Sequence, residues 1–174
     1  MDFDSLKVAI VEFVRHNDAW AIPVVFLLAF GECLAFVSLL LPATVILFAI
    51  GGLLGASGLT LWPVWVAGCV GSALGYSVSY WVGLIYKDRI AGVWPFSAHP
   101  EMLPKGRSFF NKYGASGVFV GHFFGPLRAV VPIVAGMCAM RHLHFQLANI
   151  SASVLWATGL LLPGTFGVKW LFGT

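Results

Sequence analysis

The chain has 174 residues, of which 59% are hydrophobic and only 10% are charged, and its formal net charge is +3. Soluble globular domains carry about 25% charged residues, so this composition argues against a soluble protein and predicts a single membrane domain over residues 1–174. The basic residues are spread over short polar segments, which indicates contact with anionic lipid headgroups rather than with nucleic acid.

The chain begins with an amphipathic stretch followed by a long apolar one. Residues 3–17 place apolar side chains on one face at helical spacing, which predicts a helix lying in the membrane interface. Residues 19–58 are apolar but interrupted at Pro42. Two spans of about 20 residues each would just fit this length, but a re-entrant helical hairpin fits better because no polar loop falls at the break.

Residues 62–85 predict a spanning helix that ends just before Lys87. Its small residues recur at helical spacing and predict a seam where another helix approaches closely; they are Gly68, Gly71, Gly75 and Ser79.

The second half of the chain repeats this order of segments. Residues 87–113 are the main polar connection, and its second half predicts another interfacial helix. Residues 115–140 resemble the stretch 19–58, being apolar and interrupted by the prolines Pro126 and Pro132. Residues 143–168 predict a last helix.

A weak internal register supports two related units, about 3–86 and about 100–168. A shift of 81 residues aligns small residues of the two halves, among them Gly55 with Gly136 and Ser72 with Ser153. Each unit contains an odd number of spanning helices, so the copies would have opposite orientations, which is the inverted-repeat plan of transporters.

The expected fold class is therefore an all-α polytopic membrane protein. Two facing re-entrant helical hairpins form a pseudo-inverted repeat, each with an interfacial amphipathic helix and a spanning helix. The connection 87–113 together with Arg141 carries six basic residues, whereas the terminal segments carry Lys7, Arg15 and Lys169 with more acids. Counting Lys and Arg places the connection on the cytoplasmic side.

Two full charges lie inside the apolar segments, one in each predicted hairpin. Glu32 is the only charge between Ala19 and Tyr86, and Arg128 is the only one between Lys112 and Arg141. An arginine at the centre of a spanning helix costs about 2.5–3.5 kcal/mol on insertion scales, so such residues face protein or a watery cavity. One interpretation is a buried pair that locks the halves together, and the other is a substrate or proton site.

The chemistry of Arg128 suits an oxyanion, because a guanidinium can bind a phosphate through two parallel hydrogen bonds. Half-helix N-termini at the breaks would add partial positive charge. His122, six residues earlier, could titrate near neutral pH or only hydrogen-bond within the bundle. Thr44, beside the break at Pro42, could satisfy freed carbonyls or touch a substrate, and Asn149 would hydrogen-bond across helices.

Signatures of enzymes and cofactor sites are missing from the sequence. There is no nucleophile elbow, phosphate-cradling loop, metal-binding cluster or pair of carboxylates. The three cysteines are far apart and are expected to be small buried side chains. We therefore expect no enzymatic activity, no cofactor and no metal site.

The residues around Arg128 resemble a known family signature. The stretch from Gly121 to Met137, Gly-His-Phe-Phe-Gly-Pro-Leu-Arg-Ala-Val-Val-Pro-Ile-Val-Ala-Gly-Met, is similar to that of the DedA family, also described as VTT-domain or SNARE-associated-Golgi-like membrane proteins. Glu32 with Pro42 resembles the family's first hairpin, and Gly75-Tyr76 resembles part of its Gly-Asp-x-x-Gly-Tyr stretch. The resemblance covers about residues 20–168.

The resemblance implies two re-entrant hairpins that face one another, and transbilayer movement of phosphate-bearing lipids such as undecaprenyl phosphate or phosphatidylethanolamine. It implies functional roles for Glu32 and Arg128, in the cytoplasmic (inner) membrane of a bacterium or archaeon. The chain departs from the family pattern at Thr44, Ser72 and His122, where an acid, an aspartate and an arginine are usual. A second membrane carboxylate is thus missing, so the resemblance implies phosphate binding at Arg128 more directly than proton coupling.

The expected function is that of a flippase- or scramblase-like lipid translocase whose partner is a phospholipid or a polyprenyl phosphate. Arg128 would bind the phosphate, His122 would assist, and Glu32 would balance charge or exchange a proton. The candidate substrate-binding or translocation set is completed by Pro42, Thr44, Pro126, Pro132 and Asn149. The alternatives are an ion- or proton-coupled small-molecule transporter and a membrane scaffold without transport; a homo-oligomer is compatible with each.

Overall fold

A computed structural model describes the protein over residues 18–34, 43–57, 60–92, 97 and 101–172. Within these ranges the regular elements are all helices: α2 (Asp18–Cys33), α3 (Ala43–Ser57), α4 (Leu61–Ile85), α5 (Lys87–Ala91), α6 (Met102–Tyr113), α7 (Ala115–Gly121), α8 (Gly125–Met137) and α9 (His142–Phe172). The expected all-α class is confirmed for this part of the chain. The predicted helix over residues 3–17, and Pro42, lie outside it.

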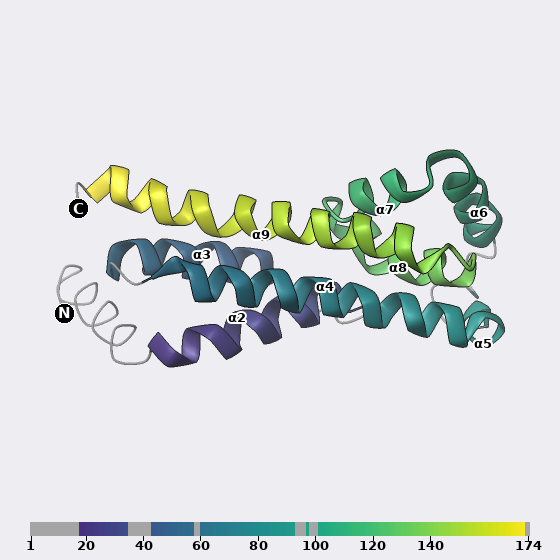
Figure 1. Ribbon diagram of the computed structural model, residues 1–174, viewed down its shortest axis with the longest axis horizontal. Coiled ribbons are helices and arrows are strands. Elements are labelled where there is room, and N and C mark those ends of the chain that lie inside the picture. The colour runs from purple at the N-terminus through teal and green to yellow at the C-terminus, as the bar shows by residue number, and fades with distance from the viewer. Residues whose placement is uncertain (1–17, 35–42, 58–59, 93–96, 98–100, 173–174) are drawn as a thin grey trace.

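Two long helices form the frame of the molecule. α4 and α9 run antiparallel along its long axis (Figure 1). Leu61–Ile85 and His142–Pro163 are each long and apolar enough to cross a membrane. At 1.5 Å per residue α4 is about 37 Å long, which exceeds the roughly 30 Å of a bilayer's hydrocarbon core. The predicted helices over 62–85 and 143–168 are both confirmed.

Large apolar side chains cover the outer faces of these two helices. They recur every three or four residues and are exposed, namely Val66, Val70, Leu74 and Val78 on α4 and Leu143, Leu147, Ile150 and Val154 on α9. Water would disfavour such continuous apolar stripes, whereas the acyl chains of a bilayer suit them. The outer faces of α4 and α9 are therefore suited to contact lipid.

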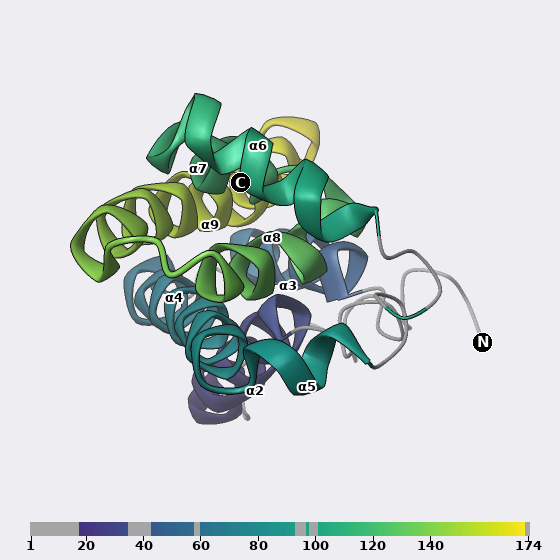
Figure 2. The ribbon, with the colours of Figure 1, turned by 90° about the vertical axis from the view of Figure 1, so that its right-hand side faces the viewer.

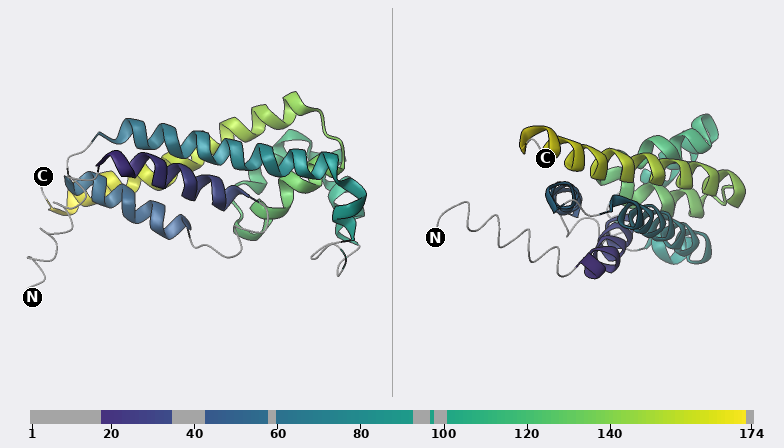
Figure 3. Two further views of the ribbon diagram at one scale, coloured as in Figure 1. Left: turned by 90° about the horizontal axis from the view of Figure 1, so that it is seen from below. Right: turned by 60° about the vertical axis from the view of Figure 1, so that its left-hand side comes forward.

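The shorter helices enter the frame from its two ends. α2 runs from one end to the middle and α3 runs back, while α7 and α8 do the same from the other end (Figures 1 and 3). α3 packs along α9, and α8 packs along α4 (Figure 2). One short helix from each half of the molecule therefore packs against the long helix of the other half.

The break in the second apolar stretch lies at residues 122–124, between α7 and α8. Pro126 stands in the first turn of α8, where its missing N–H has no intrahelical partner to lose. The expectation that Pro132 also breaks this stretch is wrong, because Pro132 lies inside α8. Pro132 disturbs the helix only locally, because it lacks the backbone N–H that would donate a hydrogen bond to the carbonyl of Arg128, four residues earlier.

The predicted small-residue seam is confirmed, and its partner is α2. A Cβ added at Gly71 would lie 2.5 Å from the carbonyl oxygen of Phe26, and one at Gly75 would collide with the carbonyl of Phe30. One turn further on, the Ser79 hydroxyl donates to the carbonyl of Cys33 at 3.2 Å. Backbone-to-backbone approach of this kind needs small residues, and it fixes where the C-terminal end of α2 lies.

Candidate functional site

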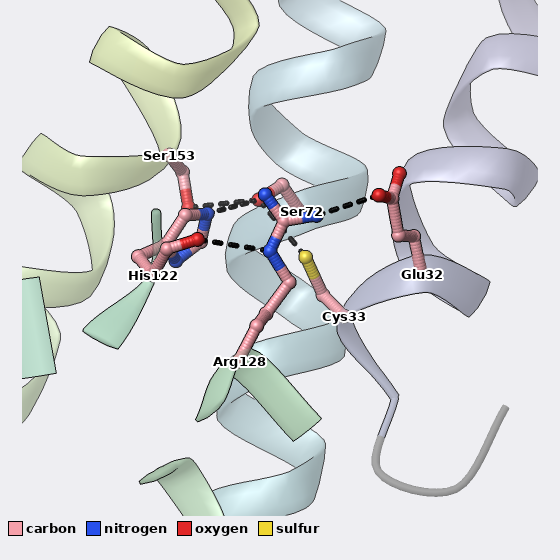
Figure 4. Close-up of polar contacts among 6 residues, drawn as sticks. All are labelled: Glu32, Cys33, Ser72, His122, Arg128 and Ser153. Carbon is pink, nitrogen blue, oxygen red and sulfur yellow. Dashed lines mark hydrogen bonds and ion pairs between the residues drawn. The ribbon is translucent and has the colours of Figure 1, made fainter. Parts of the chain in front are cut away.

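The centre of the molecule holds a buried ion pair between residues 96 positions apart in the sequence. Arg128 Nη1 lies 2.8 Å from Glu32 Oε1, and the two side chains are only 6% and 7% exposed. Glu32 comes from the last turn of α2 and Arg128 from the first turns of α8 (Figure 4). The two charged residues singled out by the sequence therefore face each other where the helix pairs meet.

The break between α7 and α8 supplies a second contact to Arg128. A helix that ends leaves its last carbonyls without intrahelical partners. One of these belongs to His122, and the Arg128 Nε donates to it at 2.9 Å. The helix resumes at once, because the backbone N–H of Arg128 donates to the carbonyl of Phe124 at 2.8 Å. The broken helix thus both positions the guanidinium and satisfies one of its donors.

Trp156 of α9 supplies the third contact. The guanidinium carbon of Arg128 lies 4.3 Å from the centroid of the Trp156 ring, in the range of a cation–π interaction. Arg128 is therefore held by three separate parts of the chain: α2, the break after α7, and α9. Its Nη2 makes no hydrogen bond to any residue that the structure describes.

The imidazole of His122 belongs to a buried polar cluster. Its Nε2 lies 3.2 Å from the Ser72 hydroxyl of α4. Ser72 in turn donates to Ser153 of α9 at 3.1 Å and lies 3.3 Å from the Cys33 thiol of α2 (Figure 4). We call Cys33, Ser72, His122 and Ser153 the central polar cluster; all four side chains are buried.

Asn149 sets the direction of the hydrogen bonds in this cluster. Its amide Nδ2 donates to the carbonyl of Ala73 at 2.9 Å, so its Oδ1 is left to accept from Ser153 at 3.4 Å. The Ser153 hydroxyl therefore donates to Asn149, and the Ser72 hydroxyl donates to Ser153. Ser72 can therefore only accept from His122, which makes Nε2 the donor and leaves a lone pair on Nδ1 of the neutral ring.

Two buried polar atoms beside the ion pair have no hydrogen-bond partner among the described residues. They are Nδ1 of His122 and the hydroxyl of Tyr76. The two rings are in contact, with centroids 4.5 Å apart. Buried polar atoms are satisfied in the great majority of cases, so each exception calls for a physical reason.

The structure brings together three of the predicted site residues directly, Glu32, His122 and Arg128. Asn149 is linked to His122 through hydrogen bonds of Ser153 and Ser72. Pro132 is buried within α8. Thr44 lies in the first turn of α3 and Pro126 in that of α8, but their side chains, like all of Pro42, fall outside the described part. Sequence reasoning did not select five central residues: Cys33, Ser72, Tyr76, Ser153 and Trp156. A signal existed for Ser72 and Ser153, which the 81-residue register aligns.

Comparison with known proteins decides the family. A family model of the VTT domain matches residues 41–166. This chain belongs to the VTT-domain family. The resemblance to the DedA signature is thereby confirmed, since the VTT-domain match includes the whole stretch around Arg128.

Several curated relatives of this VTT-domain protein are bacterial membrane proteins. Inner membrane protein YabI of Escherichia coli is 32% identical over 160 residues, which covers 91% of this chain and 63% of YabI. Uncharacterized membrane protein BU139 of Buchnera aphidicola is 30% identical over 155 residues, or 89% of this chain and 60% of that protein. Undecaprenyl phosphate transporter A of Staphylococcus aureus is 26% identical over 153 residues, which covers 80% of this chain and 75% of that protein. No solved structure matches the chain.

These findings establish this VTT-domain protein as an integral membrane protein, as its composition predicts. Its relatives belong to bacterial membranes, and the name of one specifies the inner membrane. The chain spans 63% and 60% of the length of the first two relatives. None of the three names describes an enzyme.

Proposed function

We propose that this protein is a flippase- or scramblase-like translocase that moves lipids with a phosphate headgroup, such as undecaprenyl phosphate or phosphatidylethanolamine, across the bilayer. The observation that carries the proposal is the buried ion pair between Arg128 and Glu32, placed where two pairs of short helices meet in mid-molecule. An ionisable pair at this depth is costly and marks a pathway more often than a scaffold.

The helix lengths support re-entrant hairpins around this pair. α2, α3 and α8 have 16, 15 and 13 residues. At 1.5 Å per residue they reach about 24, 22 and 20 Å, which is short of the roughly 30 Å of hydrocarbon. Each hairpin therefore enters from one face, stops at mid-depth beside the other, and returns.

The packing supports an inverted repeat. α3 of the first half lies on α9, and α8 of the second half lies on α4, which is the exchange expected when a two-fold axis in the membrane plane relates the halves. Ser72 and Ser153, which the 81-residue shift aligns, hydrogen-bond to each other at 3.1 Å. Contact between equivalent residues is expected on such an axis, and it lies beside the ion pair.

Arg128 can serve a lipid phosphate by exchanging partners. A phosphate oxygen can replace the Glu32 carboxylate on Nη1 while a second oxygen takes Nη2, giving the two-point contact that a guanidinium favours. Trp156 and the His122 carbonyl hold the side chain during the exchange. Glu32 then balances charge or takes up a proton, and the acyl chains stay in the bilayer.

The relative named undecaprenyl phosphate transporter A supports a polyprenyl phosphate as one substrate. The test is reconstitution into phosphatidylglycerol liposomes with fluorescently labelled phosphatidylethanolamine and, in parallel, labelled undecaprenyl phosphate. Arg128→Lys keeps the charge but loses the planar fork, and Glu32→Gln removes the exchanging carboxylate. We expect each to slow translocation at least about tenfold, while Arg141→Lys, at an exposed position, keeps the native rate.

Two outcomes would contradict the proposal. A native rate in Arg128→Lys would exclude two-point recognition of phosphate, and a native protein that moves neither lipid would exclude translocation of these lipids. Uptake of a water-soluble solute without lipid movement would instead identify a small-molecule transporter.

The burial of both charges also favours the alternative of a scaffold, in which the pair only joins the halves. A scaffold predicts that Arg128→Lys lowers abundance and thermal stability but has no lipid movement to change.

A further inference from the structure

The hydroxyl of Tyr76 is the most unusual polar group in the described core. Tyr76 lies in the middle of α4, is fully buried, and its hydroxyl has no hydrogen-bond partner among the residues described. A buried hydroxyl without a partner destabilises the fold relative to the same ring without it. Packing alone would therefore favour phenylalanine at this position.

Tyr80, one turn later on the same helix, shows what a structural tyrosine looks like in this protein. Its hydroxyl donates to the carbonyl of Met140 at 2.6 Å. Both rings pack against Phe145, with centroid distances of 4.3 Å for Tyr80 and 6.2 Å for Tyr76. The two residues lie on the same helix and in the same apolar cluster, but only the hydroxyl of Tyr80 makes a hydrogen bond to a described residue.

The surroundings of Tyr76 point to an anion. Its ring is in contact with that of His122, and the carbonyl of His122 accepts a hydrogen bond from Arg128 at 2.9 Å. One hydrogen-bond donor, the hydroxyl of Tyr76, thus remains unused near the one buried cation of the described core. An O–H donor at this place could donate a hydrogen bond to an oxyanion that Arg128 binds.

We propose that Tyr76 is a further headgroup-binding residue, whose hydroxyl donates a hydrogen bond to the phosphate that Arg128 binds when it releases Glu32. The inference rests on the proposed function and names a residue that the ion pair alone does not. Arg128 supplies charge, whereas Tyr76 supplies one directional donor that recognises a phosphate oxygen.

The test compares Tyr76→Phe with Tyr80→Phe, which remove the same atom one helical turn apart. In liposomes with labelled phosphatidylethanolamine we expect Tyr76→Phe to be about tenfold slower than the native protein, the loss expected for one hydrogen bond to a charged group. Its melting temperature in detergent should be equal or higher. Tyr80→Phe should show the reverse, with a lower melting temperature and the native translocation rate.

A binding measurement separates the headgroup from free phosphate. Dioleoyl phosphatidic acid added to detergent micelles should raise the melting temperature of the native protein, because a ligand that binds the folded state stabilises it, and should raise that of Tyr76→Phe less. Inorganic phosphate at the same concentration should have a smaller effect. An equal effect of inorganic phosphate would overturn the assignment to a lipid headgroup.

Failure of the inference and of the proposed function would differ. If the native protein moves lipid and Arg128→Lys is slow, but Tyr76→Phe keeps the native rate, the role of Tyr76 is wrong and the translocase stands. A lower melting temperature in Tyr76→Phe would show a structural partner for the hydroxyl and would also overturn the inference. A native protein that moves no lipid overturns both.

Discussion

Arg128 is bound in a way that only an arginine can satisfy. One nitrogen faces a carboxylate, another donates to a backbone carbonyl, and the flat face lies on an indole. A lysine has one charged nitrogen and no plane, so it could replace one of these contacts at a time. The positive charge is neutralised by Glu32, which allows it to remain in an apolar surrounding.

The first prediction concerns the free energy that couples Arg128 to Glu32. Glu32→Gln and Arg128→Met should each lower the free energy of unfolding by about 3–5 kcal/mol, because each removes one partner of a buried ion pair. The double variant should be close to the native protein, since both charges are then gone. Denaturant unfolding in detergent micelles, followed by circular dichroism, measures all four proteins. Simple additivity of the two single losses would show that the residues do not interact.

At this scale the sequence predicted the charges and missed most of their neutral partners. Glu32 and Arg128 stand out because each is the only charge in a long apolar stretch. Ser72, Tyr76 and Ser153 do not stand out, because their importance comes from partners 46 to 81 residues away in the sequence. The side chain of His122 was expected to assist Arg128, whereas its carbonyl contacts Arg128 and its ring contacts Ser72.

The contact between α2 and α4 determines where Glu32 lies. The two helices approach at Gly71 and Gly75, where a Cβ would meet backbone carbonyl oxygens of α2. Backbone atoms cannot move aside as the end of a side chain can. The seam therefore fixes the last turn of α2, which carries Glu32, against the frame.

The second prediction is that Gly71→Ala disturbs both stability and the ion pair. The new Cβ would lie 2.5 Å from the carbonyl oxygen of Phe26, so α2 must shift, at a cost of about 1–3 kcal/mol. Gly68→Ala is the matched control on the same helix, because its nearest neighbours are side-chain atoms 3.5 Å away or more. Alanine there should be neutral or stabilise by up to about 1 kcal/mol through its helix propensity. Equal melting temperatures for the two variants would contradict a tight seam.

Helix boundaries followed from the sequence where the pattern was long and apolar, as in α4 and α9. Prolines were a weaker guide. Pro132 lies inside α8, and the break comes before Pro126. A proline removes only its own N–H and crowds one carbonyl, so a helix held on both sides by packing can continue through it. Which proline interrupts a helix depends on neighbours that the sequence does not place.

The exchange of short helices between the halves ties the whole molecule together. α3 lies on the long helix of the second half and α8 on that of the first. Neither half can therefore be packed without the other, and the ion pair lies where the two meet. The sequence predicted two related units from aligned small residues. It could not predict that their short helices pack on each other's long helices, because an apolar helix face does not specify which helix it packs against.

The third prediction concerns the orientation of the whole molecule in the membrane. Thr60, just before α4, and Ser108 on α6 are both exposed and lie at opposite ends of the long axis (Figure 1). The end with Ser108 also carries a concentration of basic residues, namely Lys87, Arg89, Lys105, Arg107, Lys112 and Arg141. Because Lys and Arg are retained on the cytoplasmic side during insertion, this end should face the cytoplasm.

Single cysteines at these two positions, in a background where Cys33, Cys69 and Cys138 are replaced by alanine, make the orientation measurable. A membrane-impermeant maleimide applied to intact cells should label Thr60→Cys and spare Ser108→Cys, and inverted vesicles should give the opposite result. Labelling of both from one side would contradict α4 as a spanning helix, since the two sites lie beyond its opposite ends. A clean reversal would keep α4 as a spanning helix and would refute the charge argument.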